Sequence, residues 1–229
     1  MATFGLIHGG AMGAWCWERV VPGLEAAGHR AVAVDLPVDD PDAGLEAYAD
    51  AAVARFAGAD DLVVVGHSLG GIVVPLVAER LAVRRMVFLC AMVPEVGRSM
   101  AQQLAADPSM VAASIAPRDD DAEIDPATPE QAIALLYQDC DPEDAAAALA
   151  RMRAQADRPW REVTPLRAWP AVPASYVVGA EDRCVMPEWG RRVALERFGA
   201  PALELPSGHS PFLAIPAALV GLLDGLASA

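Results

Sequence analysis

The sequence predicts an α/β fold, in which a six-stranded and mostly parallel sheet is flanked by helices. Short runs rich in valine, leucine and isoleucine alternate along the chain with longer segments of helical periodicity, which is the pattern of a parallel sheet with crossover helices. The 229 residues fit one such domain, and 54% hydrophobic residues can fill a large core. No internal repeat divides the chain, so we expect a single domain.

Each strand is predicted from a short apolar run that turn-forming residues bound. These runs place the strands at 4–8, 31–35, 62–66, 86–91, 175–179 and 202–205. Helices are expected at 17–27 and 45–56, because a glycine follows each segment near the place where helices commonly end. A third helix should begin directly after the third strand, where apolar residues recur at helical spacing from Ile72 to Leu81.

The stretch between the fourth and fifth strands is about eighty residues long, far more than a crossover helix needs. We therefore expect residues 94–170 to form a helical cap on a core made of residues 1–93 and 171–229. Within this insertion, Thr128 and Asp141 each precede a proline and acidic residues, which is typical of the start of a helix. Two helices are predicted there.

Charge and residue usage narrow the classes of function. The net charge of −14 and the isoelectric point near 4.6 argue against nucleic acid or an anionic membrane as a partner, because both bind basic surfaces. An acidic run at 119–125 is expected to be a solvated loop without chemistry. All 17 basic residues are arginine, which excludes chemistry that depends on a lysine, such as a Schiff base.

The cysteines and the start of the chain indicate a reducing compartment. Cys16, Cys90, Cys140 and Cys184 lie far apart and form no C-x-x-C pair, so neither a zinc site nor a disulfide framework is expected. The first residues lead directly into a strand without the basic leader of a signal peptide, and no apolar stretch reaches the ~18 residues that span a bilayer. We therefore expect a cytoplasmic protein.

The residues from Leu62 to Gly71 combine a buried strand, a sharp turn and the start of a helix. Gly66 and Gly70 flank Ser68 at the G-x-S-x-G spacing, which lets strand and helix approach closely and hold the serine in a strained turn. We therefore predict that Ser68 is a nucleophile. The alternative is a glycine-rich turn with an idle serine, and the surrounding strand and helix favour the nucleophile.

A serine nucleophile needs a base, and the chain has four histidines. His29 follows a helix end and is expected in a surface turn, whereas His67 should point away from the serine that follows it. His8 begins a His-Gly-Gly segment, which is expected to shape the backbone rather than to supply a base. His209 lies in the loop after the last strand, which leaves a parallel sheet at the same edge as Ser68. We predict that His209 is the base rather than a solvated loop histidine.

The histidine in turn needs a carboxylate that orients its ring and balances its charge. Asp182 follows the fifth strand and lies between the serine and His209 in chain order, so it is our candidate. Glu181 is a close rival, and Glu95, after the fourth strand, is a more distant one. An ordinary surface role for Asp182 is the remaining alternative.

Hydrolysis of a carbonyl compound also needs N–H donors for the oxyanion that forms on attack. The amide of Leu69, directly after the serine, supplies one. The second is expected from the loop after the first strand, where Gly9 and Gly10 leave the backbone uncovered, and we choose Gly10. A glycine pair can also be a simple turn, and this pair is not part of a nucleotide-binding G-x-G-x-x-G pattern.

These motifs together resemble the plant methylesterase and hydroxynitrile lyase group of the α/β-hydrolases, and we expect a bacterial member. The matching segments are 8–10 with 13–15, 24–29, 66–70, 136–144, 181–182 with 187–188, and 208–209. The resemblance implies an α/β-hydrolase fold with a helical cap. It also implies Ser68 as nucleophile, His209 as base, Asp182 as acid, and the amides of Gly10 and Leu69 as the oxyanion hole.

The same resemblance disfavours lyase activity. In that group the lyases carry a threonine after the first-strand histidine and a lysine after the catalytic histidine, where this chain has Gly9 and Ser210. Haloalkane dehalogenases and epoxide hydrolases place aspartate at the turn where this chain has Ser68. The resemblance therefore favours ester hydrolysis, and it departs most from the group around the acidic run of the cap.

We expect a serine esterase that cleaves a small carboxylic ester, such as a methyl or aryl ester, through an acyl-enzyme and without cofactor or metal. The expected partner is the substrate alone, with the protein a monomer or homodimer. Thioester or lactone hydrolysis by the same residues, and a non-catalytic small-molecule receptor, stay open. Candidate pocket residues, each of which could instead belong to the core, are Met92, Leu135, Leu136, Trp160 and Trp169.

Overall fold

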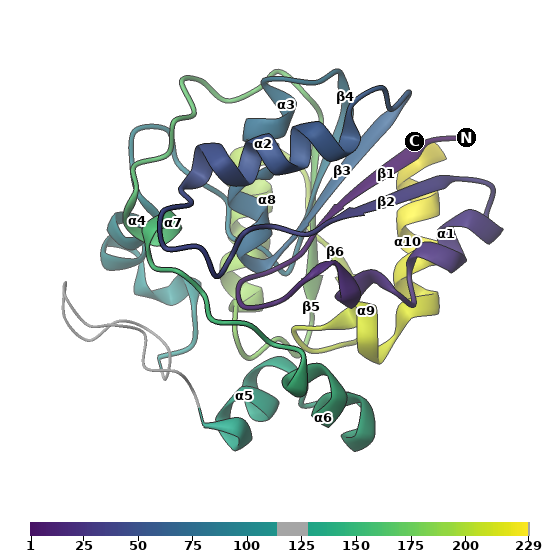
Figure 1. The fold of residues 1–229 in the computed structure, drawn as a ribbon, viewed down its shortest axis with the longest axis vertical. Coiled ribbons are helices and arrows are strands. Elements are labelled where there is room, and N and C mark those ends of the chain that lie inside the picture. The colour runs from purple at the N-terminus through teal and green to yellow at the C-terminus, as the bar shows by residue number, and fades with distance from the viewer. Residues whose placement is uncertain (114–127, 229) are drawn as a thin grey trace.

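A computed structural model of the chain describes residues 1–113 and 128–228. Its centre is a six-stranded sheet of order β2-β1-β3-β4-β5-β6, in which every neighbouring pair is parallel (Figure 1). The strands are β1 Thr3–Ile7, β2 Arg30–Val34, β3 Leu62–His67, β4 Val83–Leu89, β5 Ala174–Gly179 and β6 Leu203–Leu205. The predicted α/β class and all six predicted strands are confirmed.

Helices cover both faces of the sheet (Figure 1). On one face lie α2 Leu45–Phe56, α3 Val74–Ala78 and α8 Pro187–Phe198, and on the other lie α1 Val21–Ala26 and α10 Pro216–Ser228. Three short elements, η1 Ala14–Trp17, η2 Ser68–Ile72 and α9 Pro211–Ala214, lie in the connections. The second predicted helix, 45–56, has the predicted bounds.

Two predicted helices differ from the structure, and in both cases a proline gives the reason. The segment 17–27 does not form one helix, because the 3-10 turn η1 ends at Trp17 and α1 begins at Val21 with Pro22 in its first turn. The sharp turn around Ser68, between Gly66 and Gly70, is called the elbow here. The helix after it begins as the 3-10 turn η2, and α3 starts only at Val74, with Pro75 in its first turn. Proline lacks an N–H and fits a helix only at its start, so each helix begins anew there.

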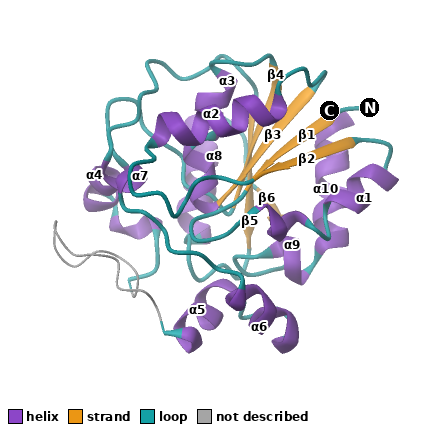
Figure 2. Ribbon diagram, in the orientation of Figure 1, coloured by secondary structure: helices purple, strands orange, loops and turns teal. Residues whose placement is uncertain are grey.

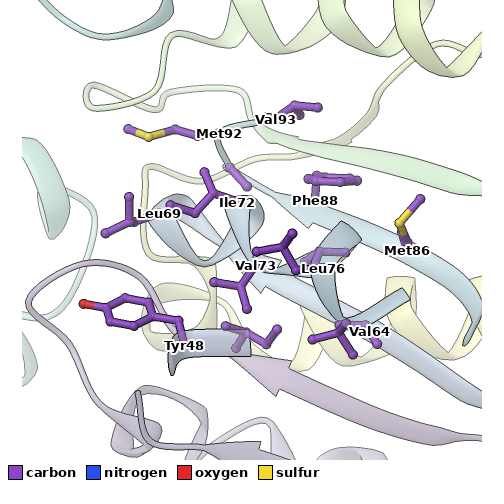
Figure 3. Close-up of a cluster of buried hydrophobic side chains, with 14 of the residues drawn as sticks. Tyr48, Val64, Leu69, Ile72, Val73, Leu76, Met86, Phe88, Met92 and Val93 are labelled. Carbon is purple, nitrogen blue, oxygen red and sulfur yellow. The ribbon is translucent and has the colours of Figure 1, made fainter. Parts of the chain in front are cut away.

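The surroundings of β3 explain why its first four residues, 62–65, are all apolar. Val63 and Val65 pack into the cluster beneath α1 and α10, whereas Leu62 and Val64 pack into the cluster beneath α2, α3 and α8. Figure 3 shows part of the second cluster, where Val64 lies among residues of η2, α3 and β4. Because both faces are covered, every side chain from Leu62 to Val65 is buried, and β3 holds the elbow rigidly at its carboxyl end.

The insertion between β4 and β5 contains helices, as predicted. They are α4 Met100–Ala106, η3 Pro108–Met110, α5 Pro129–Leu136, α6 Pro142–Ala150 and α7 Arg158–Arg161. Thr128 caps α5 by accepting the Gln131 N–H, and Asp141 caps α6 by accepting the Glu143 N–H. Figures 1 and 2 show α5 and α6 at the end of the molecule opposite the two termini. The acidic run at 119–125 lies outside the described residues.

Two further findings concern the described residues 1–113 and 128–228 alone. No helix among them is long and apolar enough to cross a membrane. No group of three or more histidine, cysteine, aspartate or glutamate side chains among them could hold a metal ion. All four cysteines have free thiols, and Cys140 is the one that is not fully buried.

Candidate active site

The elbow after β3 holds Ser68 in a strained conformation. Its φ angle is 51°, in the left-handed region that a residue with a side chain seldom adopts. The flanking glycines make this turn possible. A Cβ on Gly66 would lie 2.7 Å from the Gly70 oxygen, and a Cβ on Gly70 would lie 2.5 Å from the His8 oxygen. The strain of Ser68 is therefore maintained by close backbone packing on both sides.

Asp182 and His209 form a buried hydrogen-bonded pair. His209 Nδ1 lies 3.0 Å from Asp182 Oδ1 and 2.9 Å from Oδ2, and each side chain is 1% exposed. Asp182 Oδ1 also accepts the N–H groups of Cys184 and Val185, at 2.8 and 3.1 Å. Because carboxylate oxygens only accept, Nδ1 carries the hydrogen, and Nε2 of the neutral ring holds the lone pair.

The electrostatics of this pair favour a protonated His209 ring. Burial lowers the pKa of His209, but the negative charge of Asp182 outweighs it, helped by the nearby Cys184 side chain. The pKa of His209 therefore lies well above its ordinary value of 6.5. Such a pair takes up a proton readily and stabilises the cation that results.

The loop of His209 rests against the elbow. His67 Nε2 donates to the main-chain oxygen of His209 at 2.8 Å, and the two rings lie 4.7 Å apart. His209 Nε2 is buried and has no hydrogen-bond partner among the described residues, so no hydrogen bond joins it to Ser68. The structure thus joins Asp182 to His209 directly and brings the loop of His209 next to the turn of Ser68.

The other histidines have structural contacts. His67 supports the His209 loop, a role that its position in the sequence did not reveal. Burial, followed by the charge of His209, lowers the pKa of His67 well below 6.5. His8 donates from Nδ1 to the Gly9 oxygen at 2.8 Å and accepts the Leu36 N–H at 2.9 Å, as its predicted backbone role requires. Burial lowers the pKa of His8 to about 4.

His29 lies on another part of the molecule and differs from its prediction. Instead of a turn at the surface, its side chain is 7% exposed, packs edge-on to Phe4 and pairs with Asp224 at 2.8 Å. The reason is that α10 places the carboxylate of Asp224 beside His29. His29 therefore has no place in the site.

The two residues predicted to supply the oxyanion donors pack against each other. The Leu69 amide belongs to the first turn of η2, where N–H groups have no acceptor within the helix. The Gly10 N–H has no hydrogen-bond partner among the described residues. A Cβ on Gly10 would lie 3.2 Å from Leu69 Cδ2, and one on Gly9 would lie 3.0 Å from Ser68 Cβ. The first-strand loop therefore packs directly on the elbow.

Neither rival carboxylate contacts His209. Glu181 is exposed, and its main-chain oxygen accepts from Gln138 Nε2 at 2.8 Å. Glu95 forms an ion pair with Arg98 at 2.9 Å. Among the candidate pocket residues, Trp169 packs on Phe88 and Phe198 with its ring nearly parallel to theirs, so it belongs to the core.

Polar residues of the insertion reach both parts of the site, and sequence reasoning missed them. Asp139 Oδ2 accepts the Gly208 N–H at 2.6 Å, next to His209. Gln155 Oε1 accepts the Ala11 N–H at 3.1 Å, next to Gly10. The sequence did contain a pattern that could have indicated Asp139. Segment 136–144 resembles the methylesterase group, and the capping role of Asp141 accounts for only part of that segment.

The fold, the elbow and the paired side chains are those of a hydrolase of the α/β class. The chain belongs to the alpha/beta hydrolase family, whose model matches residues 6–222. Probable esterase PIR7A of Oryza sativa subsp. indica is 45% identical over 109 residues, which are 42% of this chain and 41% of that protein. Methylesterase 3 of Arabidopsis thaliana is 36% identical over 107 residues, 41% of each chain.

The chain thus matches about two fifths of the length of these curated relatives. Their names confirm the resemblance to the methylesterase group. Among solved structures, polyneuridine aldehyde esterase superposes with a TM-score of 0.81 at 22% identity, over 99% of both chains. This likeness confirms the α/β-hydrolase fold of the described residues.

Proposed function

We propose that this protein is a serine hydrolase that cleaves a small carboxylic ester, of which methyl and aryl esters are the first candidates. Ser68 is the proposed nucleophile, His209 the base and Asp182 the group that orients it. The amides of Gly10 and Leu69 are the proposed oxyanion hole. The observation that carries the proposal is the buried Asp182–His209 pair, whose loop rests on the elbow of a left-handed serine.

The chemistry follows from the atoms that each group offers. Ser68 Oγ attacks the ester carbonyl carbon while its proton passes to His209 Nε2, the nitrogen that holds the lone pair. The carbonyl electrons move to oxygen, and the two amides stabilise the oxyanion. Its collapse breaks the bond to the alcohol, which takes the proton from His209 and leaves an acyl-enzyme. Water then repeats these steps, releases the acid and restores Ser68.

The insertion, residues 94–170, is proposed to act as the cap of this site. Support comes from its contacts with the loops that carry the proposed groups: Gln138 and Asp139 hold the loops of Glu181 and His209, and Gln155 holds the loop of Gly10. A cap in this position excludes water, which strengthens the electrostatic interactions below it.

The proposal is tested by reaction of the protein with a fluorophosphonate probe, followed by peptide mapping, and by hydrolysis of p-nitrophenyl acetate. We expect covalent labelling at Ser68 and a loss of about 10⁵–10⁶ in kcat for Ser68→Ala. The control is Ser175→Ala, on β5, which should leave both readouts unchanged. Folded wild-type protein that stays unlabelled at Ser68 and does not hydrolyse the ester would overturn the proposal and favour a receptor.

The class of ester is a separate question for the same protein. Aryl methyl esters, short nitrophenyl esters, acyl thioesters and lactones, compared by kcat/KM, would rank the possible substrates. The name of the relative Methylesterase 3 favours methyl esters. A preference for thioesters or lactones of more than about tenfold would retain the mechanism and change the substrate class.

A further inference from the structure

A short segment of the insertion, residues 153–156, runs against the loop of the proposed oxyanion hole. We call this segment the strap, and residues 9–12 the oxyanion loop. The main-chain N–H of Arg153 donates to the Ala11 oxygen at 2.8 Å, and that of Ala156 donates to the Val38 oxygen at 2.6 Å. The Arg153 guanidinium donates to the Met12 oxygen at 3.0 and 3.1 Å and to the Leu36 oxygen at 2.9 Å. The strap therefore ties the oxyanion loop to the loop after β2.

The oxyanion loop needs such support because its conformation is strained. It is a turn, with the Met12 N–H directed at the Gly9 oxygen at a long 3.4 Å, and Ala11 at its third position has a φ of 57°. A residue with a side chain pays about 1 kcal/mol or more for this conformation. Both polar main-chain groups of Ala11 are held by the strap, its oxygen by Arg153 and its N–H by Gln155.

The side chain of Gln155 can take only one orientation. Its Nε2 donates to the Ala156 oxygen at 2.8 Å and to the Tyr48 hydroxyl at 3.1 Å, and a carbonyl oxygen accepts only. The Nε2 end is therefore fixed, and Oε1 must face the Ala11 N–H at 3.1 Å. Tyr48 is fully buried on α2, so the core sets the position of the amide.

We infer that Gln155 is a positioning residue for the oxyanion hole, an inference that rests on the proposed esterase function. By holding the Ala11 N–H, Oε1 fixes the peptide plane between Gly10 and Ala11. The Gly10 N–H, in the preceding peptide plane between Gly9 and Gly10, is then left free to meet the oxyanion. This contact is needed in the transition state and much less in the bound ester, so it acts on kcat more than on KM.

Two variants test the inference. Gln155→Ala removes the acceptor for Ala11, and we expect kcat to fall about tenfold, a part of the ~10²–10³ that loss of a whole oxyanion donor costs. Gln155→Glu keeps an acceptor but cannot donate to the Ala156 oxygen and adds a negative charge beside the oxyanion, so its loss should be larger. KM should stay within about twofold in both. The matched control is Gln131→Ala, a glutamine of the same insertion that caps α5.

A second readout separates positioning from a general loss of structure. A trifluoromethyl ketone forms a tetrahedral adduct with the serine, so its inhibition constant should rise in each variant by the factor that kcat falls. Melting temperatures establish that the variants are folded. Wild-type turnover with kcat unchanged in both variants, or a rise in KM alone, would overturn the inference. Absence of turnover in the wild type would overturn the proposed function itself.

Discussion

The Asp182 carboxylate is held by residues close to it in the chain, whereas the oxyanion loop is held by a segment more than 140 residues away. The carboxylate accepts the N–H groups of Cys184 and Val185, its immediate neighbours. The oxyanion loop contributes only main-chain groups and depends on Arg153 and Gln155. The orientation of Asp182 is therefore encoded locally, whereas the oxyanion loop is completed only when the insertion folds onto the core.

The two parts also differ in what a disturbance would change. The pair is buried and charged, so its loss should alter protonation and remove the proposed base. The oxyanion loop offers uncharged amides, which cost no desolvation of a charge and act only on the transition state. Changes in the pair should therefore alter the pH profile, and changes in the loop should alter kcat alone.

The largest effect is expected from the pair. Asp182→Asn keeps the shape of the side chain but removes the charge and favours the wrong tautomer of His209. We expect kcat to fall about 10⁴-fold with little change in KM, measured on p-nitrophenyl acetate. Glu181→Gln is the matched control, because Glu181 is adjacent and exposed and its carboxylate does not contact His209. Equal losses in the two variants would mean that the acid has been assigned wrongly.

The pH profile should separate the two parts of the site next. The pKa of His209 is raised above 6.5, so the ring is protonated at low pH and cannot accept the serine proton. The activity of the protein should therefore rise with pH as the ring loses its proton. The acid limb of kcat/KM should therefore have its midpoint above 6.5 and fall about tenfold for each pH unit below it. In Asp182→Asn, burial remains while the charge is gone, so the midpoint should move down.

Gln155→Ala provides the comparison for the pH profile. Its contact is with uncharged backbone, so the variant should lose activity at every pH and keep the wild-type midpoint. A midpoint below 6.5 in the wild type would contradict the raised pKa. A midpoint that moves in Gln155→Ala would contradict the separation between the two parts of the site.

What the sequence predicted well was encoded locally. Periodicity located all six strands and the bounds of α2, and the G-x-S-x-G spacing located the strained serine. Asp182 and His209 followed from chain order and from the common edge of a parallel sheet, and the structure joins them. The starts of α1 and α3 were missed because Pro22 and Pro75 interrupt patterns that are otherwise helical.

What the sequence did not predict depends on contacts between distant segments. Arg153 and Gln155 lie in a stretch without regular periodicity, and their partners, Ala11 and Met12, contribute only main-chain atoms. A contact between a side chain in an irregular segment and a main-chain atom produces no recognisable sequence motif in either segment. His67 was expected merely to point away from the serine, yet its ring supports the main chain of His209. This contact becomes apparent only from the packing of the His209 loop against the turn of Ser68.

The smallest effect is expected where the insertion touches the loop of His209. Asp139→Ala removes the acceptor of the Gly208 N–H, so the loop of His209 loses one contact and keeps those with Asp182 and His67. We expect kcat to fall only about two- to fivefold, because a lost hydrogen bond of this kind contributes roughly 0.5–1.5 kcal/mol. This loss should be smaller than that of Gln155→Ala.

Asp141→Ala supplies the matched control, since Asp141 lies two residues away and caps α6 without touching the site. Its expected effect is the reverse: a free energy of unfolding lower by about 1 kcal/mol, measured by urea denaturation, with kcat unchanged. If Asp139→Ala instead lost activity on the scale of Asp182→Asn, the insertion rather than the core would be holding the acid–base pair. The contrast between a pair held by the core and an oxyanion loop held by the insertion would then be wrong, because both would depend on the same distant segment.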